Sequence, residues 1–332
     1  GLPVTLLLAV FAAGRSLHPQ AIQPQLPNYS IYQQMGADDL DYVVVEVPTG
    51  ASSGTGIVGE SPYSELQWYG LMHGKRMVNG HFSRVDVTHY WYMRTDDPLF
   101  AWLGQRRFLE PDLVEPRLAE IVSDYPVGYI TVHTDLIRRY TGIATVQEVI
   151  GYLNSLPHLL CPPAIEGDLV AFRTTWHPAG CDRRTPPQTA PGVYQIDLGA
   201  PGDARYLGWG WHFAEEIIPG LTARWTGAPH ATDPTASHTL IYADLPPGGY
   251  DLTLHVQAFG ADRPTTVRVN GEHITTVTVP AADLTEITVR VPADRIGDGQ
   301  QVTLSIDGGV PGSAGERDLG LMVDWVRWAA VD

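Results

Sequence analysis

The hydrophobic pattern changes once along the chain, at a proline-rich stretch from Pro178 to Gly192. Before this stretch, apolar runs typical of buried strands, such as DYVVVEVP and VGYITVHT, alternate with helical patterns such as EPRLAEIVSDYP. After it, short strand patterns such as YDLTLHVQAF and TEITVRVP follow one another, separated by Pro-Gly, Asn-Gly and Asp-Gly turn signals. Strands that alternate with helices indicate an α/β layer, whereas consecutive short strands indicate an antiparallel sandwich.

We therefore predict two folded domains, which a length of 332 residues also favours. Residues 15–177 are expected to form an α/β domain with a small, mainly parallel sheet. Residues 178–192 would be the linker, and residues 193–332 an all-β, jelly-roll-like sandwich. In the closing strand, LGLMVDWVRWAA, strict alternation of side chains predicts that Leu321, Val323 and Trp325 face the core and that Asp324 faces away from it.

Residues 1–14 contain the uncharged apolar run Leu2 to Ala13. This run is shorter than the roughly 20 residues that span a bilayer, and no basic segment precedes it as in a signal peptide. The alternative is a buried strand or the start of a helix. We expect the end of a membrane helix or anchor, which would place both domains at the extracytoplasmic face of a bacterial cell membrane.

The composition argues against one class of partner. The chain has 21 basic and 37 acidic residues, a formal net charge of -16, which would repel a phosphate backbone. We therefore expect no nucleic-acid partner.

The two cysteines, Cys161 and Cys181, lie 20 positions apart on either side of a strand pattern. A zinc site would need further ligands at short spacing, and only His177 is close in sequence. A disulfide that closes a surface loop fits better, provided that the compartment is oxidising. We predict this disulfide and expect neither a metal nor a cofactor.

Gly54, Gly56 and Gly59 formally match the dinucleotide-binding pattern G-x-G-x-x-G. Such a site needs a tight turn between strand and helix and an acidic residue about 20 positions later, at the end of a second strand. The turn is too long here and no second strand follows at that distance, so we favour a flexible surface loop. A serine nucleophile elbow, G-x-S-x-G, does not occur in the sequence.

Paired carboxylates and clustered aromatics offer two further candidate sites. Adjacent acids point apart on a helix or strand, so they are better explained as solvated surface than as a glycosidase pair. The stretch YLGWGWHF carries Trp209 and Trp211, whose rings would suit stacking against a sugar. Core aromatics of the sandwich are the more common explanation. The acid pairs are Asp38 with Asp39, Asp96 with Asp97, and Glu215 with Glu216.

The stretch WYGLMHGKRMVNGHFSR gathers polar and basic side chains after a helical pattern. We favour a structural reading: the helix ends at Gly74, Lys75 and Arg76 lie near its negative end, and Asn79-Gly80 forms a turn. Contact with an acceptor sugar or a lipid headgroup is the functional alternative. The candidate contact residues are His73, Lys75, Asn79, His81 and Arg84.

The order VVVEVP, glycine-rich loop, YGLMHGKRMVNGHFSR and YPVGYITVH resembles the extracytoplasmic part of polytopic C-superfamily (GT-C) membrane glycosyltransferase-like proteins. The ending RDLGLMVDWVRW is similar to the closing strand of their C-terminal β-sandwich. The resemblance covers nearly the whole chain. It implies that the parent protein transfers a sugar from a polyprenyl-phosphate donor, using an acidic residue in an early loop between membrane helices.

That loop is not in this sequence, so no catalytic residue carries over and we predict no autonomous activity. The chain would then be the soluble extracytoplasmic portion of such an enzyme, with the membrane and a glycan or lipid-linked sugar as partners. The alternative is a non-catalytic cell-surface or assembly protein whose β-sandwich binds glycans or partner subunits.

Overall fold

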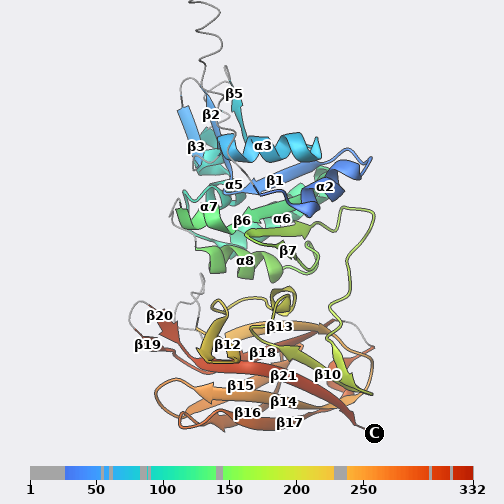
Figure 1. Cartoon of the computed structure of the whole chain (residues 1–332), viewed down its shortest axis with the longest axis vertical. Helices are drawn as coiled ribbons and strands as arrows, with labels where there is room; N and C mark the ends of the chain where they lie inside the picture. The colour runs from blue at the N-terminus through green and yellow to red at the C-terminus, as the bar shows by residue number, and fades with distance from the viewer. Residues whose placement is uncertain are drawn as a thin grey trace, which may run out of the picture.

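The computed structural model describes residues 27–53, 56–59, 63–82, 88, 91–139, 145–227, 238–298, 301–314 and 317–331. Figure 1 shows the α/β domain stacked on one side of the β-sandwich, with the linker running between them along the edge of the molecule. The apolar segment Leu2 to Ala13 lies outside these residues. Among the described residues, no helix is both long and apolar enough to cross a membrane.

The α/β domain is built on a five-stranded sheet in the order β4-β1-β6-β8-β7. Strand β1 pairs in parallel with β4 and β6, whereas β8 is antiparallel to both β6 and β7. The sheet is therefore mixed and not mainly parallel as predicted, because a tight hairpin at Gly167, with φ of 59°, reverses the chain between β7 and β8. The strands are β1 (Val43–Val47), β4 (Arg76–Met77), β6 (Val127–His133), β7 (Ala164–Glu166) and β8 (Leu169–Arg173).

Helices cover both faces of this sheet. Alternation along β1 divides its side chains: Val44 packs with α2 and α3, while Val45 and Val47 pack with α5, α6 and α8. Helix α3 ends at His73 and Gly74 has φ of 65°, which confirms the predicted helix end. The helical segments are α2 (Ser30–Ala37), α3 (Tyr63–His73), η1 (Tyr92–Asp96), α5 (Pro98–Leu103), α6 (Pro111–Asp124), α7 (Thr134–Arg139) and α8 (Val146–Asn154).

The glycine-rich segment after β1 forms a small sheet. Strands β2 (Gly50–Ser53) and β3 (Gly56–Gly59) are antiparallel, and β2 pairs in parallel with β5 (Gly80–Phe82). The expectation of a flexible loop is therefore wrong, since two of the three glycines of the G-x-G-x-x-G match lie in a strand. Gly54 lies outside the described residues. A strand at this position offers no helix N-terminus to a pyrophosphate.

The antiparallel β-sandwich predicted for the second half is present. One sheet has the order β11-β12-β21-β10-β9 with β14 and β17 on the other side of β21, and the second has the order β13-β18-β15-β16. Strand β9 lies within the stretch expected to be linker. The elements are β9 (Gln188–Ala190), β10 (Val193–Asp197), η2 (Asp203–Tyr206), β11 (Glu215–Ile218), β12 (Leu221–Trp225), β13 (His238–Asp244), β14 (Gly249–Ala258), β15 (Arg263–Val269), β16 (Glu272–Val279), β17 (Thr285–Val291), α9 (Ala293–Ile296), β18 (Gln301–Asp307), β19 (Gly312–Ala314), β20 (Arg317–Leu319) and β21 (Leu321–Val331).

A β-bulge at Asp324 corrects the predicted faces of the closing strand. Val323 pairs with Val256 and Trp325 with the adjacent His255, so Asp324 is the extra residue of β21. An extra residue inverts the alternation. Val323 before the bulge and Trp328 after it therefore both face the core. Trp325 lies partly exposed on the outer face, where its ring stacks 5.1 Å from the His255 ring.

The two domains share buried contacts. Trp209 of the sandwich packs into the core of the α/β domain, with its ring centroid 5.6 Å from that of Tyr152 on α8. The buried Asn154 amide, at the end of α8, donates to the carbonyls of Ala204 and Leu207. These contacts fix the orientation of one domain on the other.

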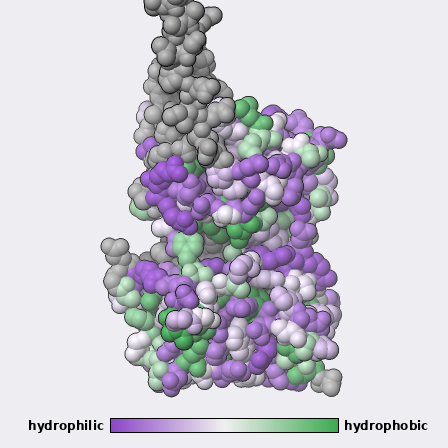
Figure 2. Space-filling view, in the orientation of Figure 1, coloured by the Kyte–Doolittle hydropathy of each residue, from purple (hydrophilic) through white to green (hydrophobic). Residues whose placement is uncertain are grey.

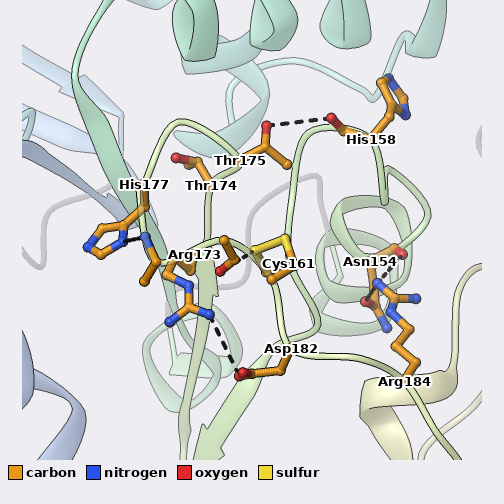
Figure 3. The surroundings of a disulfide bond; sticks show 12 residues. Asn154, His158, Cys161, Arg173, Thr174, Thr175, His177, Asp182 and Arg184 are labelled. Carbon is orange, nitrogen blue, oxygen red and sulfur yellow. Dashed lines mark hydrogen bonds and ion pairs between the residues drawn. A yellow bond between two sulfur atoms is a disulfide. The ribbon is translucent and has the colours of Figure 1, made fainter. Parts of the chain in front are cut away.

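The predicted disulfide is confirmed. Cys161 and Cys181 are bonded, with their Cα atoms 4.9 Å apart. Figure 3 shows the bond beside Arg173, whose guanidinium lies 3.7 Å from the Asp182 carboxylate. The bond attaches the start of the linker to the end of β8, because the Cys161 amide donates to the Arg173 carbonyl.

Candidate functional site

His73 belongs to a buried polar cluster centred on Glu46 of β1. One carboxylate oxygen of Glu46, Oε2, lies 2.8 Å from His133 Nε2 and accepts hydrogen bonds from Tyr32, at 2.7 Å, and from Thr131. The other oxygen, Oε1, lies 3.6 Å from His73 Nε2. All five side chains are almost inaccessible to solvent, at 2% exposure or less. In the described structure these five side chains therefore present almost no surface to a substrate.

The charge of Glu46 is stabilised by its neighbours. Burial alone would raise the pKa of this carboxyl, but contacts from His133 and His73, followed by the Thr131 hydroxyl, lower the pKa to about 2. Glu46 is therefore ionised at neutral pH. Through its contacts this one carboxylate connects β1, β6, α2 and α3, and loss of any one partner would leave a buried polar group uncompensated.

The tautomer of His73 limits what the cluster can bind. Its Nδ1 accepts a hydrogen bond from the Lys75 amide at 2.9 Å, so the ring proton of neutral His73 is on Nε2, toward Glu46. A metal at Nε2 would need the lone pair that this proton occupies. Among the described residues, no group of three or more His, Cys, Asp or Glu side chains is arranged to hold a metal ion.

The other residues of that stretch do not converge on a common site. Lys75 Nζ donates to the carbonyls of Asp38 and Leu40 and lies 4.7 Å from the Tyr42 ring centroid, so it attaches the end of α3 to the loop after α2. The buried Asn79 amide donates to the Pro48 carbonyl at 3.1 Å. His81 lies in β5 but its side chain is not described, and Arg84 lies outside the described residues.

The aromatic stretch YLGWGWHF forms one wall of a cleft between the domains. Trp209 is buried in the α/β core, whereas Trp211 lines the cleft and donates from Nε1 to the Leu240 carbonyl at 2.9 Å. Gly208 directly precedes Trp209, at a point where a Cβ atom would be 2.7 Å from the Tyr242 ring of the sandwich and 2.8 Å from the Ser155 hydroxyl of the α/β domain. Glycine therefore allows the close approach of the domains that forms the cleft.

This interdomain cleft has a volume of about 200 Å³. Helices α7 and α8 and the β7-β8 hairpin line one side of the cleft. The sandwich lines the other side with Ala204, Leu207, Gly208, Trp211, His212, Phe213 and Arg224. Phe213 and Ile165 are 38% and 44% exposed, so solvent reaches apolar surface at the cleft. Figure 2 shows hydrophobic atoms at the level where the two domains meet.

The polar side chains of the cleft differ in whether they already form hydrogen bonds within the protein. Arg224 is engaged in a bidentate ion pair with Asp203, at 2.5 and 2.8 Å, and His212 is bonded to the Asp318 carbonyl at 2.8 Å. Burial lowers the pKa of His212, so its imidazole is neutral at neutral pH. Among the described residues, the Gln147 amide at the start of α8 makes no hydrogen bond, which leaves it available to a ligand.

Sequence reasoning did not select Phe213, Gln147 or Arg224. Phe213 lies two positions after Trp211 in the same aromatic stretch, so its type and position were a usable signal. Gln147 carries no such signal, because a polar residue in the first turn of a helix is usually solvated surface. Only the packing of α8 against the sandwich places it in the same cleft as Phe213.

No protein-family model matches the sequence, and no curated protein matches it. Several solved structures are similar at TM-scores near 0.3. A CBM36-1 domain of a multidomain xylanase from the hindgut metagenome of Trinervitermes trinervoides is 13% identical, covering 42% of this chain and 98% of that one, with a TM-score of 0.30. CBM35 from Paenibacillus barcinonensis is 14% identical over 42% of this chain and 98% of its own, at 0.28. A GH26-CBM35 β-(1,4)-mannanase from Podospora anserina is 17% identical over 42% of this chain but only 28% of its own, at 0.30.

Proposed function

We propose that this chain is a non-catalytic recognition unit that binds a neutral carbohydrate in the interdomain cleft, and that its sandwich is of the jelly-roll type. The observation that carries the proposal is that the solvent-accessible ring of Phe213 and the Gln147 amide line the same cleft. Among the described residues this amide makes no hydrogen bond. Sugars present apolar C–H faces and hydroxyl rims, so an aromatic face combined with an amide suits them.

The geometry of the cleft supports binding without turnover. The Arg138 guanidinium lies 5.4 Å from the Phe213 ring centroid, a contact that restricts the orientation of the ring. The described residues that line the cleft include no carboxylate, so they supply neither the acid nor the nucleophile of glycoside hydrolysis. The role that remains is to position a glycan.

We also propose that the two domains are the extracytoplasmic part of a membrane glycosyltransferase-like protein. The disulfide supports an oxidising compartment. The apolar segment Leu2 to Ala13 supports attachment to a membrane. In this arrangement the cleft would present or retain a glycan while a separate region of the parent protein performs the transfer.

The test is calorimetric titration with neutral gluco-, manno- and xylo-configured trisaccharides. We expect saturable binding of at least one, weakened roughly two- to tenfold by Phe213→Ala. Gln147→Ala should weaken it by a similar factor, since a neutral hydrogen bond contributes about 1 kcal/mol. Phe108→Ala is the matched control, because Phe108 is exposed in the α/β domain and does not line the cleft.

An equal loss of trisaccharide affinity in Phe213→Ala and Phe108→Ala would contradict the assignment of binding to the cleft. Absence of binding by all three trisaccharides, with the fold intact by circular dichroism, would contradict the proposed function itself.

A further inference from the structure

A second cavity lies on the other side of η2 from the interdomain cleft. Ala204 and Leu207 line the cleft, whereas Asp203, Arg205 and Tyr206 line this second cavity, which we name the η2 pocket. Its volume is about 420 Å³. Gln195 and Asp197 of β10 and Thr189 of β9 complete the polar part of its wall. The η2 pocket therefore belongs to the sandwich alone.

Asp197 is an uncompensated carboxylate in this pocket. Among the described residues its side chain forms no hydrogen bond or ion pair, although the two nearest carboxylates do. Asp203 is bound by Arg224, and Asp324 lies 2.7 Å from His255 Nδ1. Burial, followed by repulsion from Asp324 and Asp203, raises the pKa of Asp197. Because Asp197 is exposed at the wall of the η2 pocket and no cation of the described residues neutralises it, its carboxylate is accessible to a cationic ligand.

Arg205 brings an opposite charge to the same pocket without neutralising Asp197. One guanidinium nitrogen donates to the Arg183 carbonyl at 2.9 Å, and the group lies 5.7 Å from the Tyr206 ring centroid. Its Nε is buried and has no hydrogen-bond partner. No carboxylate of the described residues lies within ion-pair distance of Arg205. The η2 pocket thus presents one carboxylate and one guanidinium that are not paired with each other.

We propose that the η2 pocket binds a sugar that carries a free, protonated amine. The ammonium would form a charge-assisted hydrogen bond with the Asp197 carboxylate, a contact that a neutral sugar cannot make. Neighbouring ring oxygens would accept from Arg205, and the neutral side chains of Gln195 and Thr189 suit the remaining hydroxyls. This site is separate from the neutral-sugar cleft and does not depend on it.

The probes are glucosamine trisaccharide with free amines and the same trisaccharide fully N-acetylated, titrated into the full chain at pH 6 and low salt. We expect binding of the amine form only, because acetylation removes its charge. Asp197→Asn should weaken that binding by about tenfold or more, since a hydrogen bond to a charged group contributes about 1.5–3 kcal/mol. Asp251→Asn is the matched control, because Asp251 lies in the same sheet, is half-buried and pairs with Arg290 instead of lining the pocket.

Replacing Asp197 should not unfold the protein, because a carboxyl whose pKa is raised by folding is destabilising when ionised. A circular dichroism melt of the variant verifies this. Equal affinity for the acetylated sugar, or full binding by Asp197→Asn, would overturn the proposal. Free lysine binding as tightly as the amino sugar would overturn the assignment to a sugar. Amino-sugar binding that persists in Phe213→Ala would separate this site from the cleft.

Discussion

The clearest test of the structural role of the buried cluster is Glu46→Gln. Glutamine keeps the shape of the side chain but replaces one oxygen by an NH2 group. Tyr32, Thr131 and His133 all contact Oε2, and the proton on His73 Nε2 is directed toward Oε1. If the glutamine NH2 group takes the place of Oε2, it faces the donor groups of Tyr32 and Thr131. If it takes the place of Oε1, it faces the N–H of His73. Removing one partner of a buried charged network costs about 3–5 kcal/mol, so we expect the free energy of unfolding to fall by that amount at pH 7.

The wild-type protein should also show a pH dependence that the variant lacks. The pKa of Glu46 is about 2 in the folded protein, against 4.5 for an unperturbed glutamate. Because the pKa of Glu46 is lower in the folded protein, its carboxylate becomes protonated at a higher pH in the unfolded chain than in the folded protein. The stabilisation is complete above pH 4.5 and is lost as the pH falls toward 2, a change of about 3 kcal/mol.

Urea unfolding followed by tryptophan fluorescence at pH 7, 4.5 and 3 measures both effects. Glu120→Gln is the control, because Glu120 is exposed and pairs with Arg117 at the surface of α6; an ion pair with a solvent-exposed carboxylate typically contributes about 1 kcal/mol or less. The reasoning would be refuted if Glu46→Gln were as stable as Glu120→Gln at pH 7. An identical loss of stability between pH 4.5 and 3 in wild type and Glu46→Gln would refute the lowered pKa.

Two further predictions concern the sandwich and the disulfide. Trp328→Ala should lower the free energy of unfolding by about 3–5 kcal/mol, because this ring is fully buried against Tyr250. Trp325→Ala, on the outer face, should lower it by only about 1 kcal/mol. Comparable urea midpoints for the two variants would contradict the bulge. Reduction of the Cys161–Cys181 bond should lower stability by roughly 3 kcal/mol, and mass spectrometry of the unreduced protein should detect no free thiol.

Local pattern was sufficient for much of the fold. The apolar runs that became β1 and β6, the helix end at Gly74 and the antiparallel strands of the sandwich all follow from short-range periodicity and turn chemistry. The disulfide followed from the isolation of two cysteines in a loop-rich stretch. Each of these features depends on residues close together in sequence.

Features that depend on distant partners were not predictable in this way. Helix, strand and loop patterns could not show that Glu46, His73 and His133 meet, because each lies on a different element and its neighbours along the chain are ordinary for that element. The interdomain cleft is similar: Gln147 and Phe213 line the same cleft only because α8 packs on the sandwich.

The closing strand shows the division most directly. Its sequence alone determined that it is a strand with an apolar face, since β-branched and aromatic residues alternate with others along it. The tertiary structure decided which tryptophan is in the core, because pairing with β14 places the extra residue at Asp324, where its carboxylate meets His255. One inserted residue moves every later side chain to the opposite face, and only the register with a strand about 70 positions away fixes where that residue lies.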